Sequence, residues 1–175
     1  MEFYTARALF GVGLVLTIVG GVTSFFDFGA VSLVGLVLTL VGLYFVAEAY
    51  SRKDAFYYML YGVVATFVGV VVLALFVIGA LVASGGFAFM FDAVGFLVGF
   101  WLLFWAVVVV GAYFEKRAFQ ALGEASGRRE FLDAAKFVWW GALLTVVVVG
   151  LVLVLVGYVF AIVGAFKLEK PGSTL

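Results

Sequence analysis

The sequence lacks cysteine and histidine, and it also has no asparagine and a single glutamine, Gln120, among its 175 residues. Disulfide bonds, thiolate chemistry and imidazole metal sites are therefore excluded. Without asparagine the chain has no acceptor for N-linked glycosylation. Proline occurs once, at Pro171. Broken helices that bind ions or solutes often carry proline, so its absence from the first 170 residues predicts uninterrupted helices.

Charged residues are also scarce: they make up only 11% of the chain, while 67% of its residues are hydrophobic. A soluble domain usually has about 25% charged and about 45–50% apolar residues. A water-facing surface could not be covered with so few charges. The composition therefore predicts a multi-pass protein of the cell membrane, surrounded by membrane lipids.

The apolar runs are long and continuous, which predicts transmembrane helices rather than the alternating strands of a membrane barrel. We expect an all-α bundle that forms a single unit over residues 1–170, followed by a flexible tail at 171–175. The polar segment 115–136 between the fourth and fifth helices is predicted to form two short amphipathic helices broken at Gly127. The expected helices are 6–24, 30–49, 56–83, 93–114, 131–149 and 150–168.

The charge-free run 137–166 leaves two topologies open, six helices or five with a long last helix. Basic residues collect on the cytoplasmic side of membrane proteins. A turn near Gly150 would put all ten basic residues on one side, with both termini cytoplasmic, and this favours six helices. The ten are Arg7, Arg52, Lys53, Lys116, Arg117, Arg128, Arg129, Lys136, Lys167 and Lys170.

Glycines recur at intervals of seven along several predicted helices, so each stripe stays on nearly one helix face. In lipid, small residues let helix backbones approach closely, and the stripes therefore predict glycine-mediated packing. Gly95 and Gly99 add a GxxxG pair on the fourth helix. The seven-residue pairs are Gly13 and Gly20, Gly35 and Gly42, Gly62 and Gly69, and Gly150, Gly157 and Gly164.

Ionisable side chains are expected only near the helix ends. Glu115, beside Lys116 and Arg117, is interpreted as an anchor at the membrane interface. Four threonines lie within helices, and such a hydroxyl usually bonds to its own helix backbone. The alternative is a contact with an ion or solute. These threonines are Thr17, Thr39, Thr66 and Thr145.

Aromatic residues provide the candidates for a lipid or apolar-ligand contact, with core packing, lipid exposure or simple interfacial anchoring as the alternatives. They are Trp101, Trp105, Phe87, Phe89 and Phe91. The segment 115–136 provides the candidates for contact with a partner protein, with packing on its own bundle as the alternative. They are Phe119, Leu122, Phe131 and Leu132.

No motif for a hydrolase, a phosphate-binding loop, a metal site or a cofactor is present, which favours a non-enzymatic protein. The segment 115–136 has five basic and four acidic residues, so it lacks the positive charge that nucleic acids attract. We expect an accessory or scaffold bundle that associates with itself or with other membrane proteins. The alternative is a channel or carrier for a neutral or lipid-like solute.

The order of features resembles a family of archaeal and bacterial integral membrane proteins, domain of unknown function 996. The resemblance covers about residues 6–168. It rests on the glycine-rich first hairpin, the polar link before AFYYMLYGVV, and the final stretch EFLDAAKFVWWGALLTVVVVGLVLVLVGYVFAIVGAFKL. It implies an archaeal membrane protein and assigns no role to any residue.

Overall fold

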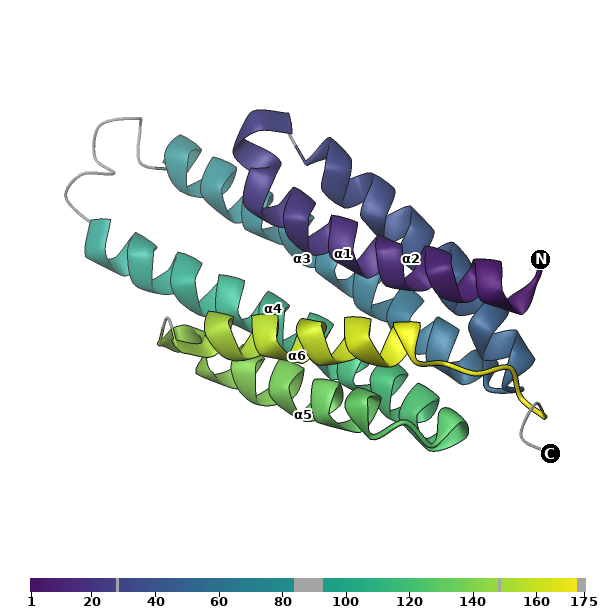
Figure 1. Cartoon of the computed structure of the whole chain (residues 1–175). Helices are drawn as coiled ribbons and strands as arrows, with labels where there is room; N and C mark the ends of the chain where they lie inside the picture. The colour runs from purple at the N-terminus through teal and green to yellow at the C-terminus, as the bar shows by residue number, and fades with distance from the viewer. Residues whose placement is uncertain (28, 84–92, 148, 173–175) are drawn as a thin grey trace.

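A computed structural model describes residues 1–27, 29–83, 93–147 and 149–172 of the chain (Figure 1). Within these residues the protein is all-helical and contains no strand. Five of the six α-helices, all except α5, are long and apolar enough to cross a membrane. The helices are α1 (Phe3–Asp27), α2 (Ala30–Ala49), α3 (Lys53–Ala83), α4 (Ala93–Ser126), α5 (Arg129–Leu143) and α6 (Val149–Phe166), with a short 3₁₀ turn at Leu144–Val146.

Helices α1 and α2 form a hairpin whose backbones approach closely at glycines. A Cβ atom built on Gly13 would lie 2.3 Å from the backbone nitrogen of Thr39, and one built on Gly42 would lie 2.3 Å from that of Phe10. Real Cβ atoms do not approach other atoms this closely. Residues with a side chain at these positions would therefore force the two helices apart.

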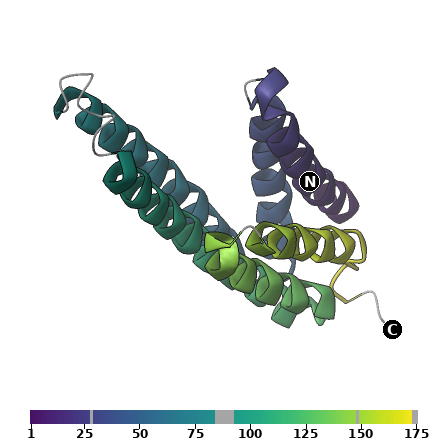
Figure 2. The same cartoon turned by 90° about the vertical axis from the view of Figure 1, so that its left-hand side faces the viewer.

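Helices α3 and α4 form a second, longer hairpin that diverges from the first, so the molecule has the outline of a V (Figure 2). Helices α5 and α6 lie across the base of the V, α5 along α4 and α6 beside α1. The base is where aromatic side chains from different hairpins meet. Phe131 of α5 stacks on Phe10 of α1 at 6.3 Å and on Phe119 of α4 at 6.3 Å, measured between ring centroids.

Helix α5 is amphipathic, which explains why it lies along α4. Its buried residues recur at helical spacing, and they are Phe131, Ala134, Ala135, Val138, Gly141 and Ala142. The opposite face has charges that pair along the helix, with Asp133 3.8 Å from Arg129 and 3.7 Å from Lys136. With 15 residues, α5 is about 22 Å long and therefore shorter than a hydrocarbon core of about 30 Å.

The six-helix prediction is confirmed, and the alternative of one long last helix is wrong, because the chain turns between α5 and α6. Several helix boundaries differ from expectation, and two of these differences matter most for the fold. The turn begins at Leu144, ahead of Gly150, and Gly150 lies inside α6. A Cβ atom on Gly150 would lie 2.2 Å from the backbone nitrogen of Thr145, so this glycine allows the hairpin to close.

The second difference concerns the polar segment after residue 114. It does not begin a separate short helix, because α4 continues without a break to Ser126. The predicted break at Gly127 is present, where the backbone takes a φ of 67°, a conformation that favours glycine. The continuation of α4 places Glu115 well inside a helix instead of at its end.

The N-terminus and the C-terminal residues that the structure describes lie at the same end of the bundle as the α2–α3 and α4–α5 links (Figure 1). Which side of the membrane this end faces is a prediction of the positive-inside rule. The chain has no native cysteine, so single cysteines report the side directly. We expect Arg129→Cys and Lys170→Cys to be labelled by an impermeant reagent only from the cytoplasmic side. Ala30→Cys, at the start of α2 and at the other end of the bundle, is the control and should be labelled from the other side. Labelling of Lys170→Cys from outside would contradict the predicted topology.

Candidate functional site

A carboxylate and a phenol meet where α4 crosses α6. The hydroxyl of Tyr158, in α6, donates a hydrogen bond of 2.9 Å to Oε2 of Glu115, in α4. Both residues are partly buried. An acidic group that is partly buried among apolar helices is costly, and in the helices of membrane proteins such a group commonly marks a functional site. Glu115 is therefore the first candidate for such a site.

The basic side chains next to Glu115 in the sequence contact aromatic residues instead of its carboxylate. The Lys116 ammonium lies 4.7 Å from the ring centre of Trp139, and Arg117 donates a hydrogen bond of 3.3 Å to the hydroxyl of Tyr113. Within the described ranges no ion pair involves Glu115. The carboxylate thus makes one hydrogen bond, to Tyr158, through one of its two oxygens.

A cavity of about 170 Å³ lies against this pair, between four helices. Its polar lining is Glu115, Tyr158 and Thr66, and the remaining lining residues are small or aliphatic. Those residues are Val108, Gly111, Ala112, Val138, Ala142 and Val154. Glycine at position 111 makes room for the threonine, since a Cβ atom there would lie 2.7 Å from Thr66 Oγ1.

Thr66 behaves differently from the other three helix threonines. Thr17, Thr39 and Thr145 each donate a hydrogen bond of 2.8–2.9 Å to the carbonyl four residues earlier, which confirms the prediction for these three. Thr66 makes no such bond with any residue that the structure describes, and it is exposed at the edge of the cavity. Its hydroxyl is available to a ligand.

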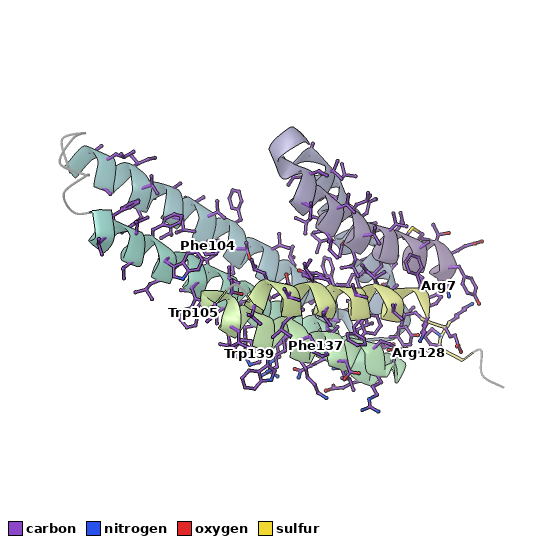
Figure 3. All side chains as sticks on the ribbon, turned by 60° about the vertical axis from the view of Figure 1, so that its left-hand side comes forward. Arg7, Phe104, Trp105, Arg128, Phe137 and Trp139 are labelled. Atoms are coloured by element: carbon purple, nitrogen blue, oxygen red, sulfur yellow. The ribbon has the colours of Figure 1, made fainter. Side chains whose placement is uncertain are left out.

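The aromatic candidates are not gathered at this cavity. The indole nitrogen of Trp105 donates a 3.2 Å hydrogen bond to the carbonyl of Leu143, and the ring lies beside the α5–α6 turn (Figure 3). Trp101 is 43% exposed and packs against Phe104. Whether lipid contacts these rings remains a prediction. The other three candidates, Phe87, Phe89 and Phe91, lie outside the described residues.

The four candidates for a partner contact pack on the chain's own bundle, as the alternative interpretation of these residues predicts. Phe119, Leu122 and Phe131 are each at most 1% exposed. Leu132 is partly buried, and its side chain fills the space above Gly123. A partner could not reach the three buried side chains in this conformation.

The C-terminal residues join the polar ends of the hairpins, near the labelled Arg7 and Arg128 (Figure 3). Arg7 donates a 2.8 Å hydrogen bond to the carbonyl of Leu168. Glu169 accepts hydrogen bonds from Arg128, through its carboxylate, and from Tyr50, through its backbone carbonyl. Partial burial raises the pKa of Tyr50. We call Lys167, Leu168 and Glu169 the C-terminal clasp.

A further ion pair of the clasp joins the Lys167 ammonium to Glu130 Oε1 at 2.7 Å. This hydrogen bond lowers the pKa of the Glu130 carboxyl. A carboxyl whose pKa is lowered on folding adds stability above its unfolded pKa and loses it as the pH falls through its folded pKa. Since both groups are partly exposed, the pair adds little at neutral pH.

Sequence reasoning missed the Glu115–Tyr158 pair because it placed Glu115 at a helix end. One signal was present. Tyr158 is the only tyrosine in the charge-free run 137–166, and a buried phenol usually needs a hydrogen-bond partner. The identity of that partner depends on how α6 crosses α4, which no local pattern contains.

The fold defines a polytopic helical bundle of the membrane-protein type, with a mainly apolar cavity among its helices that Glu115, Tyr158 and Thr66 also line. The chain belongs to the family described as "Protein of unknown function (DUF996)", which matches residues 31–159. It is 30% identical over 172 residues to an uncharacterized protein of Methanocaldococcus jannaschii, covering 96% of this chain and 94% of that protein. No solved structure matches the chain significantly.

Proposed function

We propose that the protein is a non-enzymatic accessory or scaffold bundle of the cell membrane, and that it associates with a second copy of itself through the α3–α4 hairpin. The proposal rests on the observation that the helices bury very different shares of their residues within the bundle. In their most apolar stretches α3 and α4 bury only 11% and 6% of their residues, whereas α1 and α2 each bury 33%. The hairpin that stands apart in Figure 2 is also the one whose surface is least covered.

One exposed face of α3 has the geometry that can pair helices. Residues 67–83 are apolar throughout, and five of them on this face are spaced at alternating intervals of four and three, as in a coiled-coil seam. All five residues of this stripe are exposed, and Gly79 has open space above it. They are Val68, Val72, Leu75, Gly79 and Val82. Two copies inserted in the same direction can pair such a stripe about a two-fold axis, with the glycines allowing close approach.

Cysteine cross-linking in native membranes tests the dimer. Because the pairing is two-fold, Gly79→Cys should meet its own copy and form a disulfide-linked dimer under mild oxidation. Val70→Cys is the matched control, since Val70 is 55% exposed on a different face of the same helix. We expect a dimer for Gly79→Cys and a monomer for Val70→Cys. Equal cross-linking of the two variants, or a monomer in native mass spectrometry from mild detergent, would exclude this association.

A channel or carrier for a neutral or lipid-like solute is the second candidate, and the cavity beside Glu115 favours it. That cavity lies among four helices at the base of the V, and Thr66 is exposed at its edge. Liposomes containing the purified protein would show faster permeation of a small polyol, or faster lipid exchange between leaflets, than liposomes without it. Rates equal to those of empty liposomes in both assays would exclude the candidate.

A further inference from the structure

We propose that Thr66, Glu115 and Tyr158 form a binding site for a primary ammonium group on an alkyl chain. This inference goes beyond the proposed dimer. It uses the same cavity as the carrier candidate, but it requires only binding and no passage across the membrane. Three helices contribute to the site, α3 with Thr66, α4 with Glu115 and α6 with Tyr158.

The three side chains offer the acceptors that an ammonium group needs. Glu115 Oε1 accepts no hydrogen bond from the described residues, whereas Oε2 is bonded to the hydroxyl of Tyr158. That hydroxyl, having donated its proton to Oε2, keeps a lone pair for a ligand. The Thr66 hydroxyl supplies the third oxygen. A primary ammonium has three N–H donors and no acceptor, so donors and acceptors match in number.

The charge of Glu115 also favours an ammonium group over an uncharged polar group as the ligand. Lys116 and Arg117, the basic residues beside Glu115, are directed to Trp139 and Tyr113. A carboxylate in apolar surroundings is costly unless a positive charge or hydrogen bonds compensate it. A bound ammonium would supply both, and its hydrogen bonds to the carboxylate would be of the stronger, charge-assisted kind.

The remaining lining fits a short alkyl chain. Val108, Val138 and Val154 provide aliphatic surface, while Gly111, Ala112 and Ala142 leave space. The cavity of about 170 Å³ is several times the ~30 Å³ share of one water molecule in the liquid. It therefore admits an ammonium group with its first methylene groups.

Calorimetric titration of the full-length protein tests the site, in nanodiscs made of phosphatidylcholine. This lipid carries a quaternary ammonium without N–H donors, so its headgroup does not compete. The ligands are n-butylammonium, tetramethylammonium (charge without donors) and butanol (a donor without charge). We expect saturable binding of butylammonium that is at least about tenfold tighter than binding of either control, the size of one charge-assisted hydrogen bond. Equal binding of the three compounds, or no binding, would overturn the proposal.

Two variants test the contributions of Glu115 and Thr66 to binding. Glu115→Gln keeps the shape of the side chain and removes the charge, and it should weaken butylammonium binding by at least about tenfold. Thr66→Val replaces a hydroxyl that makes no bond to the described residues, so it should fold normally and bind several-fold more weakly. If Glu115→Gln does not fold, Thr66→Val decides the test. Wild-type affinity in a folded variant of either kind would overturn the site.

A second set of nanodiscs distinguishes a lipid headgroup from a free amine. Phosphatidylethanolamine carries a primary ammonium, unlike phosphatidylcholine. If the site takes this headgroup, butylammonium should bind more weakly in phosphatidylethanolamine nanodiscs because the lipid competes. Unchanged affinity would identify a free alkylamine as the ligand, and either result retains an ammonium site. Failure of the dimer or of the flux assay would leave these binding results unaffected.

Discussion

Replacing Gly42 with alanine is expected to lower the free energy of unfolding by about 1–3 kcal/mol, the usual cost of inserting an extra carbon into a packed interface. The new Cβ atom would lie 2.3 Å from the backbone nitrogen of Phe10 and 2.8 Å from the carbonyl oxygen of Ala6. Because both neighbours are backbone atoms, no side chain can rotate away. The α1–α2 hairpin must open instead, and the helix contacts along its length weaken together.

Gly21→Ala in the same hairpin is the matched control, since no atom lies within 4 Å of a Cβ atom there. It should change the free energy of unfolding by less than about 0.5 kcal/mol, as an exposed substitution does. The measurement is reversible unfolding by sodium dodecyl sulfate in mixed micelles, followed by circular dichroism. Equal destabilisation by the two substitutions would mean that the close glycine contact does not hold the hairpin.

Replacing Phe131 with alanine should have the largest effect of any single side-chain truncation in the base of the V, about 3–5 kcal/mol. The ring is 0% exposed and stacks on Phe10 and Phe119. It also lies against Gly164, where a Cβ atom would be 3.1 Å from the ring. The substitution would therefore leave a cavity at the point where α1, α4, α5 and α6 meet.

The control for this prediction is Phe67→Ala, which removes the same ring from a position that is 70% exposed on α3. Lipid or detergent surrounds that ring in both folded and unfolded states, so we expect a change below about 0.5 kcal/mol. The same unfolding assay compares the two variants. If Phe131→Ala were as stable as the wild type but lost a co-purifying protein, Phe131 would be a partner contact after all.

How much was predictable differs between the fold and the site. The charge-free runs identify the five helices that are long enough to span a membrane, because a span needs about 20 apolar residues. Helix α5, with 15 residues, does not meet this requirement. The six-helix prediction needed one further argument, the placement of the basic residues. The exact turn between α5 and α6 was missed, because it depends on Thr145 packing against Gly150, a contact within the folded hairpin.

The candidate site could not be predicted from the composition and periodicity of the sequence. Periodicity shows that a helix has a packed face, but in lipid every face is apolar, and the pattern does not say which helices meet. The basic neighbours of Glu115 in the sequence predict an anchor at the membrane interface. The structure covers it with α6 and turns those neighbours toward Trp139 and Tyr113.

The sequence by itself determined the class of protein and favoured six helices, and it predicts that the chain's basic residues lie on one side of the membrane. These properties follow from local composition and from the cost of charge in lipid. Only the tertiary structure decided that the two long hairpins diverge, that Phe119 and Phe131 are core residues, and that Glu115 meets Tyr158 beside a cavity. These depend on how helices far apart in the sequence cross, and crossing is set by the detailed fit of their surfaces.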